Sequence, residues 1–234
     1  MSYQFERTSL LIGEDALNKL KDKNIIIFGL GGVGGYVCEA LVRSGIENFT
    51  IVDNDKVSIS NINRQIIANL NTVGRYKTDL IEERMKSIND KVKVTKLNMF
   101  YLPEKSNQID FSKYDYVIDC IDTVSAKIDI IAKAKENNTL VISSMGMGNK
   151  LNPLDIKIAD ISKTSVCPLA RVMRYELRKR NIKNVKVCYS TEEPVETESK
   201  IDEESKKKIP GSISFVPSVA GLVIASEVIK DLIK

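Results

Sequence analysis

The pattern of apolar and polar residues divides the first two thirds of the chain into short apolar runs separated by amphipathic segments. The apolar runs are four to six residues long and predict strands at 24–28, 49–52, 92–97, 116–120 and 139–143. Between them, apolar residues recur with helical spacing, most clearly over 32–44, 77–88 and 125–136. This alternation predicts an α/β fold whose mostly parallel sheet is covered by helices on both faces.

The pattern becomes looser in the last third of the chain. There we expect a strand near Ile156, a helix from Pro168, a strand near Val187, a short strand in SISFV, and a final helix after Pro217. No internal repeat and no linker rich in Gly or Ser interrupts the sequence. We therefore expect a single domain over 1–234, with a core over 1–150 and a looser α+β part over 151–234.

Composition is that of an ordinary globular protein, with 43% hydrophobic and 28% charged residues. The N-terminus lacks the apolar segment of a signal peptide, and the apolar stretch 209–225 is interrupted by two prolines and two glycines, so we expect no membrane association. Four cysteines lie far apart without a Cys-x-x-Cys pair, which favours a cytoplasmic protein without structural zinc. The chain has no histidine, so its chemistry must use other groups.

The net charge of +4 conceals two blocks of opposite sign. Seven basic residues and one acid lie between Lys163 and Lys183, and seven acids and one lysine lie between Glu192 and Glu204. Such blocks are typical of an interaction surface followed by a solvated acidic loop, here near 191–208.

A glycine motif, FGLGGVG, follows the first predicted strand. Gly29 would permit a tight turn, Gly31 would let the backbone approach a phosphate, and Gly34 would allow close helix packing. Asp53 ends the second strand, where a carboxylate can accept hydrogen bonds from ribose hydroxyls. A glycine turn without a ligand is the alternative. The combination of strand, glycines, helix and acid favours a Rossmann-like, doubly wound nucleotide-binding fold.

Further charged residues follow this motif and favour a triphosphate over a dinucleotide. Arg64 and Lys77 would add two cations near the phosphates, which suits the concentrated charge of ATP. Asp122 follows the fourth strand at the carboxyl edge of the sheet, where it could hold Mg²⁺. Alternatively, the two cations are solvated helix residues and Asp122 is a helix cap.

Several motifs resemble the adenylation core of the ubiquitin-activating superfamily: GLGGVG, VDNDKVSISNINRQ, GRYK and DCID. The resemblance runs from FERTSLLIG to SVAGLVIASEVIK and implies that Arg64, Lys77 and Asp122 act in catalysis, with Mg²⁺ at Asp122. It also implies a homodimer in which Arg7 reaches the partner's site. The nucleotide-binding set that it implies is Gly29, Gly31, Gly32, Gly34, Asp53, Asp55, Ser60, Asn61, Arg64, Lys77 and Asp122.

The stretches KTSVCPLARVMRYELRKR and GSISFVPSVAG resemble the tRNA threonylcarbamoyladenosine dehydratase branch of that superfamily. The resemblance implies ATP-dependent cyclisation of the threonylcarbamoyl group on the adenosine beside the anticodon. The threonyl carboxylate would attack the α-phosphorus of ATP, and a nitrogen or oxygen of the carbamoyl group would then expel AMP. Because the second step is intramolecular, it can proceed without a strong enzymatic nucleophile.

Charge patterning independently favours tRNA as the partner. From Pro168, three arginines share one helical face, and Leu169, Val172, Met173 and Leu177 are expected on the other. A solvated helix face is the alternative. We predict a phosphate-binding surface that comprises Arg171, Arg174, Arg178, Lys179 and Arg180.

Parts of the sequence also fit three other functions. An adenylyltransferase for a sulfur-carrier or ubiquitin-like protein could use Cys167, which precedes a helix, although the chain lacks the zinc pairs and rhodanese-like extension of that branch. Tyr175 and Lys179 have the Tyr-x-x-x-Lys spacing of a short-chain dehydrogenase, but that reading leaves the phosphate-binding residues unexplained. A non-catalytic RNA-binding module would need no ATP site.

Overall fold

One seven-stranded sheet organises the computed structural model, which describes residues 3–198 and 209–234. The strand order is β3-β2-β1-β4-β5-β7-β6, and only the pairing of β6 with β7 is antiparallel. In this order β1 lies between β2 and β4. From β2 the chain continues to β3 at one edge of the sheet, and from β4 it continues to β5 toward the other edge, so the turn after β1 lies where the strand order reverses. The strands are β1 (Asn24–Phe28), β2 (Asn48–Val52), β3 (Lys93–Leu97), β4 (Tyr116–Asp119), β5 (Leu140–Ser144), β6 (Ile156–Asp160) and β7 (Lys186–Ser190).

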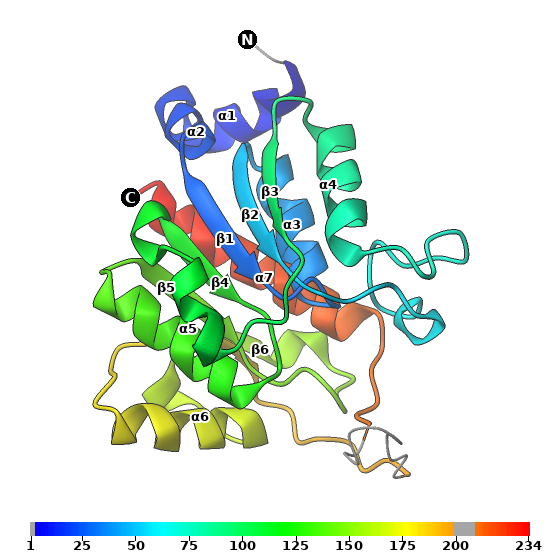
Figure 1. Cartoon of the computed structure of the whole chain (residues 1–234), viewed down its shortest axis with the longest axis vertical. Coiled ribbons are helices and arrows are strands. Elements are labelled where there is room, and N and C mark those ends of the chain that lie inside the picture. Colours follow the sequence, from blue (N-terminus) through cyan, green and yellow to red (C-terminus); the bar gives the residue numbers. More distant parts are fainter. Residues whose placement is uncertain (1–2, 199–208) are drawn as a thin grey trace.

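Helices cover both faces of this sheet (Figure 1). The α-helices are α1 (Glu6–Ile12), α2 (Glu14–Lys21), α3 (Gly34–Arg43), α4 (Lys77–Ile88), α5 (Val124–Glu136), α6 (Pro168–Lys179) and α7 (Phe215–Leu232). Short 3-10 helices are η1 (Tyr3–Phe5), η2 (Ile59–Asn61), η3 (Pro103–Gln108), η4 (Phe111–Lys113), η5 (Pro153–Asp155) and η6 (Ile161–Lys163). Within the described ranges, no helix is both long and apolar enough to cross a membrane.

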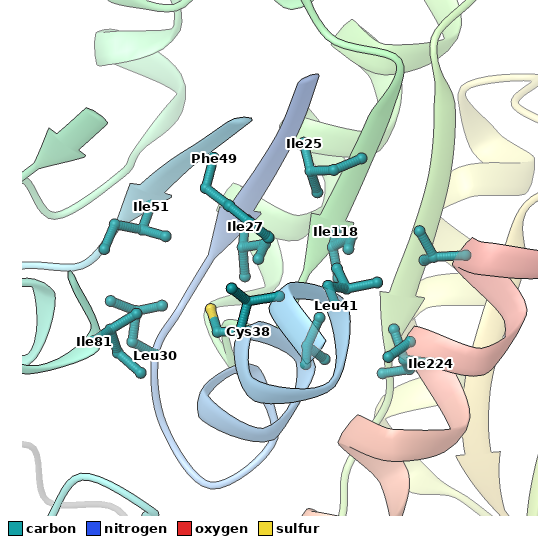
Figure 2. Packing of buried hydrophobic residues seen from close by; sticks show 14 of the residues in the cluster. Ile25, Ile27, Leu30, Cys38, Leu41, Phe49, Ile51, Ile81, Ile118 and Ile224 are labelled. Carbon is teal, nitrogen blue, oxygen red and sulfur yellow. The ribbon is translucent and has the colours of Figure 1, made fainter. Parts of the chain in front are cut away.

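Alternate residues of each strand enter two separate cores. Ile25 and Ile27 pack with α3, α4 and α7, as Figure 2 shows for Ile27, Leu41 and Ile224. Ile26 and Phe28 face the opposite way and pack with α5 and α6. Because both faces of the sheet are covered, its inner strands are rich in apolar residues, which explains why they can be recognised in the sequence.

The α/β, doubly wound fold predicted from the sequence is confirmed, and the predicted core strands and helices agree with the structure to within two residues. The prediction of a strand in SISFV is wrong, because residues 212–214 form no strand and α7 begins at Phe215, two residues before Pro217. Proline is compatible with the first turn of a helix, where its missing N–H has no intrahelical acceptor. Part of the predicted acidic loop, residues 199–208, lies outside the described residues.

Candidate active site

A cavity of about 320 Å³ opens at the carboxyl edge of the sheet, where β1, β2 and β4 end. It brings together most of the residues expected to bind a nucleotide. Those that line it are Gly29, Gly31, Gly32, Asp53, Asp55, Asn61, Arg64, Lys77 and Asp122. Its volume lies at the small end of the range for ligand pockets.

The glycine turn forms the floor of this cavity. Gly29 has a φ of +85°, and a Cβ atom there would lie 2.9 Å from the carbonyl carbon of Cys120. Gly34 lies outside the cavity at the start of α3, where a Cβ atom would come within 1.8 Å of the Gly29 carbonyl oxygen. Glycine is therefore required at position 29 for the backbone conformation and at position 34 for close packing.

Asp53 connects the end of β2 to the glycine turn. Its carboxylate accepts hydrogen bonds from the backbone N–H groups of Leu30 (2.7 Å) and Asp55 (2.8 Å). Burial raises the pKa of Asp53, an effect that the nearby Lys77 opposes. The carboxylate is therefore fixed in direction at the cavity wall and retains lone pairs for a hydroxyl donor.

Two cations line the cavity, one at each end of the segment 65–76. Lys77 is 5% exposed, and its Nζ lies 2.7 Å from Oδ2 of the more exposed Asp55. Arg64 is half-buried and donates from Nη1 to the carbonyl oxygen of Ser60 at 2.7 Å. Ser60 itself does not line the cavity, so its side chain is separated from the predicted nucleotide-binding set. Both cations can compensate phosphate charge at this edge.

Asp122 lies in the loop that joins β4 to α5. It is exposed, and Thr123 rather than Asp122 occupies the N-cap position of α5. Within residues 3–198 and 209–234, its carboxylate has no hydrogen-bond or ion-pair partner, and no cluster of three acidic or thiol side chains could hold a metal ion. A single free carboxylate fits Mg²⁺ that is also bound by phosphate oxygens and water.

Several lining residues were not predicted. Met99, Phe100 and Tyr101 follow β3 and form an apolar wall, and the Tyr101 hydroxyl donates to Asp129 at 2.6 Å. Gln65 is 6% exposed, and its buried Oε1 has no partner in the described structure. The position of residues 99–101 just after a strand, and of Gln65 beside Arg64, could have indicated them.

Arg7 is exposed on α1 and does not line the cavity. Figure 1 shows α1 and α2 beyond the amino ends of the central strands, whereas the cavity lies at their carboxyl ends. Arg7 is therefore not part of the cavity in its own subunit.

The arginines of α6 line a second, open cavity of about 940 Å³. Arg171, Arg174 and Arg178 line it together with Lys183, as expected for one helical face, whereas Lys179 and Arg180 do not. Arg174 is half-buried and donates to the carbonyl oxygen of Thr164 at 2.9 Å. Arg180 instead pairs with Glu176.

The opposite face of α6 differs from the prediction at one residue. Val172 is 44% exposed, so its predicted place on the buried face is wrong. The buried residues Ala170, Met173 and Leu177 follow an i, i+3, i+7 spacing, and Val172 falls outside the narrow stripe that they define.

Residues expected for two alternative functions lie away from the nucleotide cavity. Cys167 is only 2% exposed at the N-terminus of α6. Tyr175 and Lys179 are exposed on α6, and neither lines the nucleotide cavity. A dehydrogenase would need that tyrosine beside its cofactor, and sulfur transfer would need an accessible thiol.

Comparisons with known proteins agree with this geometry. The tRNA threonylcarbamoyladenosine dehydratase of Bacillus subtilis is 42% identical, and the alignment covers 100% of this chain and 96% of the relative. The Escherichia coli dehydratase in complex with ATP has a TM-score of 0.88 and 33% identity, covering 98% of this chain and 93% of that one. The same dehydratase has also been solved with AMP. Residues 5–234 match the ThiF family, to which this chain therefore belongs.

Proposed function

We propose that this chain is an ATP-dependent tRNA threonylcarbamoyladenosine dehydratase. The observation that carries the proposal is a cavity lined by Asp53, Arg64, Lys77 and Asp122 in a chain that matches dehydratases over almost its full length. ATP binds in the cavity at the carboxyl edge of the sheet, and the similar E. coli enzyme has been solved in complex with ATP. The modified adenosine of tRNA is the second substrate.

In the first step, a carboxylate oxygen of the threonyl group attacks the α-phosphorus of ATP and displaces pyrophosphate. Asp53 holds the ribose and the glycine turn presents backbone N–H groups to the phosphates. Arg64 and Lys77 stabilise the negative charge that moves onto the leaving pyrophosphate. Mg²⁺, held by Asp122 and phosphate oxygens, would supply further charge compensation.

In the second step, a nitrogen or oxygen of the carbamoyl group attacks the acyl-adenylate carbonyl and expels AMP. The attacking atom and the carbonyl belong to one substituent, so the enzyme has only to hold a folded conformation. No imidazole is required, which agrees with the absence of histidine. In total the substrate loses one molecule of water. The oxygen atom of that water comes from the threonyl carboxylate and leaves as part of AMP.

We propose that tRNA contacts the open α6 cavity through Arg171, Arg174 and Arg178. Three cations on one face would bind phosphates and give affinity without reading bases. Lys179 and Arg180 do not line this cavity, so they would add positive charge beside it without contacting an RNA that lies in it.

A double charge reversal tests this tRNA surface. Arg174 is left unchanged because its bond to Thr164 could make a variant fail for structural reasons. Arg171→Glu with Arg178→Glu should weaken tRNA binding at least tenfold and reduce its salt dependence, while ATP affinity stays within about twofold. Lys91→Glu with Lys93→Glu, at the opposite edge of the sheet, is the charge-matched control. Equal tRNA affinity of the two double variants would exclude α6 as the tRNA-binding surface.

The catalytic proposal is tested by incubating the enzyme with ATP and tRNA that carries threonylcarbamoyladenosine. Nucleoside mass spectrometry should show ATP-dependent loss of one water, and NAD should not replace ATP. Asp53→Ala should weaken ATP binding by about tenfold through the lost ribose contact. An enzyme that binds NAD but not ATP, or that leaves the modified adenosine unchanged, contradicts the proposal.

A further inference from the structure

A buried ion pair lies directly behind the wall of the nucleotide cavity. Asp119 ends β4 and Lys127 lies in the first part of α5; both side chains are 0% exposed, and Lys127 Nζ is 2.8 Å from Asp119 Oδ2. Neither residue lines the cavity. Desolvating two charges costs about as much as their attraction returns, so such a pair is weak evidence for a purely stabilising role.

The hydrogen bonds of Lys127 extend beyond Asp119. Its ammonium group also donates to the carbonyl oxygens of Ile121 (3.0 Å) and Ser144 (2.8 Å). An ammonium group has three N–H donors, and these three oxygens use all of them. Lys127 therefore holds two backbone segments that lie at the ends of neighbouring strands, β4 and β5.

Asp119 completes the connection from the other side. Its Oδ2 accepts a hydrogen bond from Ser143 at 2.5 Å, and its Oδ1 accepts one from the backbone N–H of Ile121 at 3.3 Å. Ile121 is thus held through both its N–H and its carbonyl group. Satisfied polar networks of this kind are rigid because every shift breaks several bonds in a dry interior.

The segment held in this way forms part of the active site. Residues 120–123 all line the nucleotide cavity, and Asp122 lies directly after Ile121. On its other side the segment packs against the turn at Gly29, where the nearest backbone atoms of Cys120 leave no space for a Cβ atom. The loop that carries Asp122 is therefore fixed between a glycine turn and a buried ion pair.

We propose that Lys127 is a positioning residue, which holds Asp122 in the place that ATP adenylation requires. It acts through the carbonyl groups of Ile121 and Ser144 and touches no substrate. The inference rests on the proposed function, because it assigns Lys127 a part in that reaction. Errors of about 1 Å in the position of a catalytic group can lower a rate about a hundredfold.

The decisive variant removes both charges. Lys127→Met alone would leave the Asp119 carboxylate unpaired in the interior and could unfold the protein. Asp119→Asn with Lys127→Met avoids that unpaired charge, so the variant should fold, with a lower melting temperature because the carbonyl groups of Ile121 and Ser144 lose a donor. We expect its kcat for the dehydration to fall at least tenfold, while the Kd for ATP changes less than about threefold because Asp53 and the glycine turn are untouched.

A second ion pair provides the matched control. Lys186 pairs with Asp231 and Glu227 and joins β7 to α7, away from the cavity. Lys186→Met with Asp231→Asn should change the melting temperature but leave kcat at the wild-type value. A second active-site pair, Asp119→Asn with Lys127→Gln, retains hydrogen-bonding groups in case the methionine variant does not fold. Wild-type kcat in the folded methionine double variant overturns the proposal, whereas the glutamine variant, whose amide can donate to the same carbonyl groups, should keep more activity than the methionine variant.

Hydrogen exchange gives a test that needs no variant and no turnover. In the wild-type enzyme without ATP, the backbone amide of Ile121, which donates to the buried Asp119 carboxylate, should exchange nearly as slowly as those of β4. Exchange at the rate of exposed loops would show that the ion pair does not hold the segment, whatever the activity. Absence of dehydratase activity in the wild-type enzyme would instead contradict the proposed function.

Discussion

Asp122 extends from a loop rather than from a strand or helix, and its carboxylate is free to meet a ligand. Asp122→Asn keeps the size of the side chain but removes the charge that Mg²⁺ prefers. We expect kcat to fall about a hundredfold or more with an unchanged melting temperature. Asp90→Asn, at an exposed turn after α4, is the control and should retain full activity. Wild-type turnover by Asp122→Asn would mean that the carboxylate takes no part in the reaction.

Among single residues, the sequence predicts the site residues that belong to a recognisable motif. The glycines, Asp53, Arg64 and Lys77 come from short patterns that a phosphate site requires, and the structure gathers them at one cavity. Gln65 ends the motif VDNDKVSISNINRQ but was assigned no role from it, and Lys127 follows no such pattern. In the sequence Lys127 cannot be distinguished from a solvent-exposed lysine on a helix. Only the tertiary packing of β4 and β5 around it buries it beside Asp119.

At the scale of elements, strands were predictable because burial on both faces makes them mostly apolar. The segment SISFV alternates polar and apolar residues as a strand does, but its last two residues, Phe215 and Val216, begin α7, because tertiary packing overrides the local preference. That packing is close: a Cβ atom at Gly221 would lie 2.5 Å from the Val33 carbonyl oxygen and 2.8 Å from the Cβ of Tyr36. Helices α3 and α7 therefore meet backbone to backbone, next to the phosphate turn.

The close approach of α3 and α7 predicts the effect of Gly221→Ala. In an isolated helix this change would be stabilising, by about 1 kcal/mol. Here the added methyl group must push α7 away from α3, so we expect a net loss of about 1–3 kcal/mol in the free energy of unfolding. Urea denaturation measures it, with Ser226→Ala on the exposed side of α7 as the control. A stabilised Gly221→Ala variant would show that the two helices can separate without cost.

For the whole molecule, the separation of Arg7 from its own cavity supports the proposal of a homodimer in which Arg7 acts on the partner's ATP. Leu10 and Leu11 on the same helix are 82% and 86% exposed, as residues of a subunit interface would be in a single chain. An arginine supplied across an interface can stabilise phosphate charge that its own subunit cannot reach.

Subunit mixing tests this arrangement. Arg7→Ala and Asp122→Asn enzymes should each be inactive, and random mixing in equal amounts should restore about one quarter of wild-type activity per site, because half of the dimers then contain one intact site. Size-exclusion chromatography of differently tagged subunits verifies exchange. Verified exchange without recovered activity would contradict a role for Arg7 in the neighbouring site.

The proposed reaction depends on activation of the threonyl carboxylate, which the enzyme joins to AMP. The direct measurement uses tRNA whose threonyl carboxylate carries ¹⁸O in both oxygens, with unlabelled ATP, and determines the label in the products by mass spectrometry. Adenylation predicts one ¹⁸O atom in the phosphate group of AMP, no label in pyrophosphate, and one ¹⁸O atom retained in the cyclised nucleoside. Label in inorganic phosphate together with ADP, or AMP without label, would contradict it.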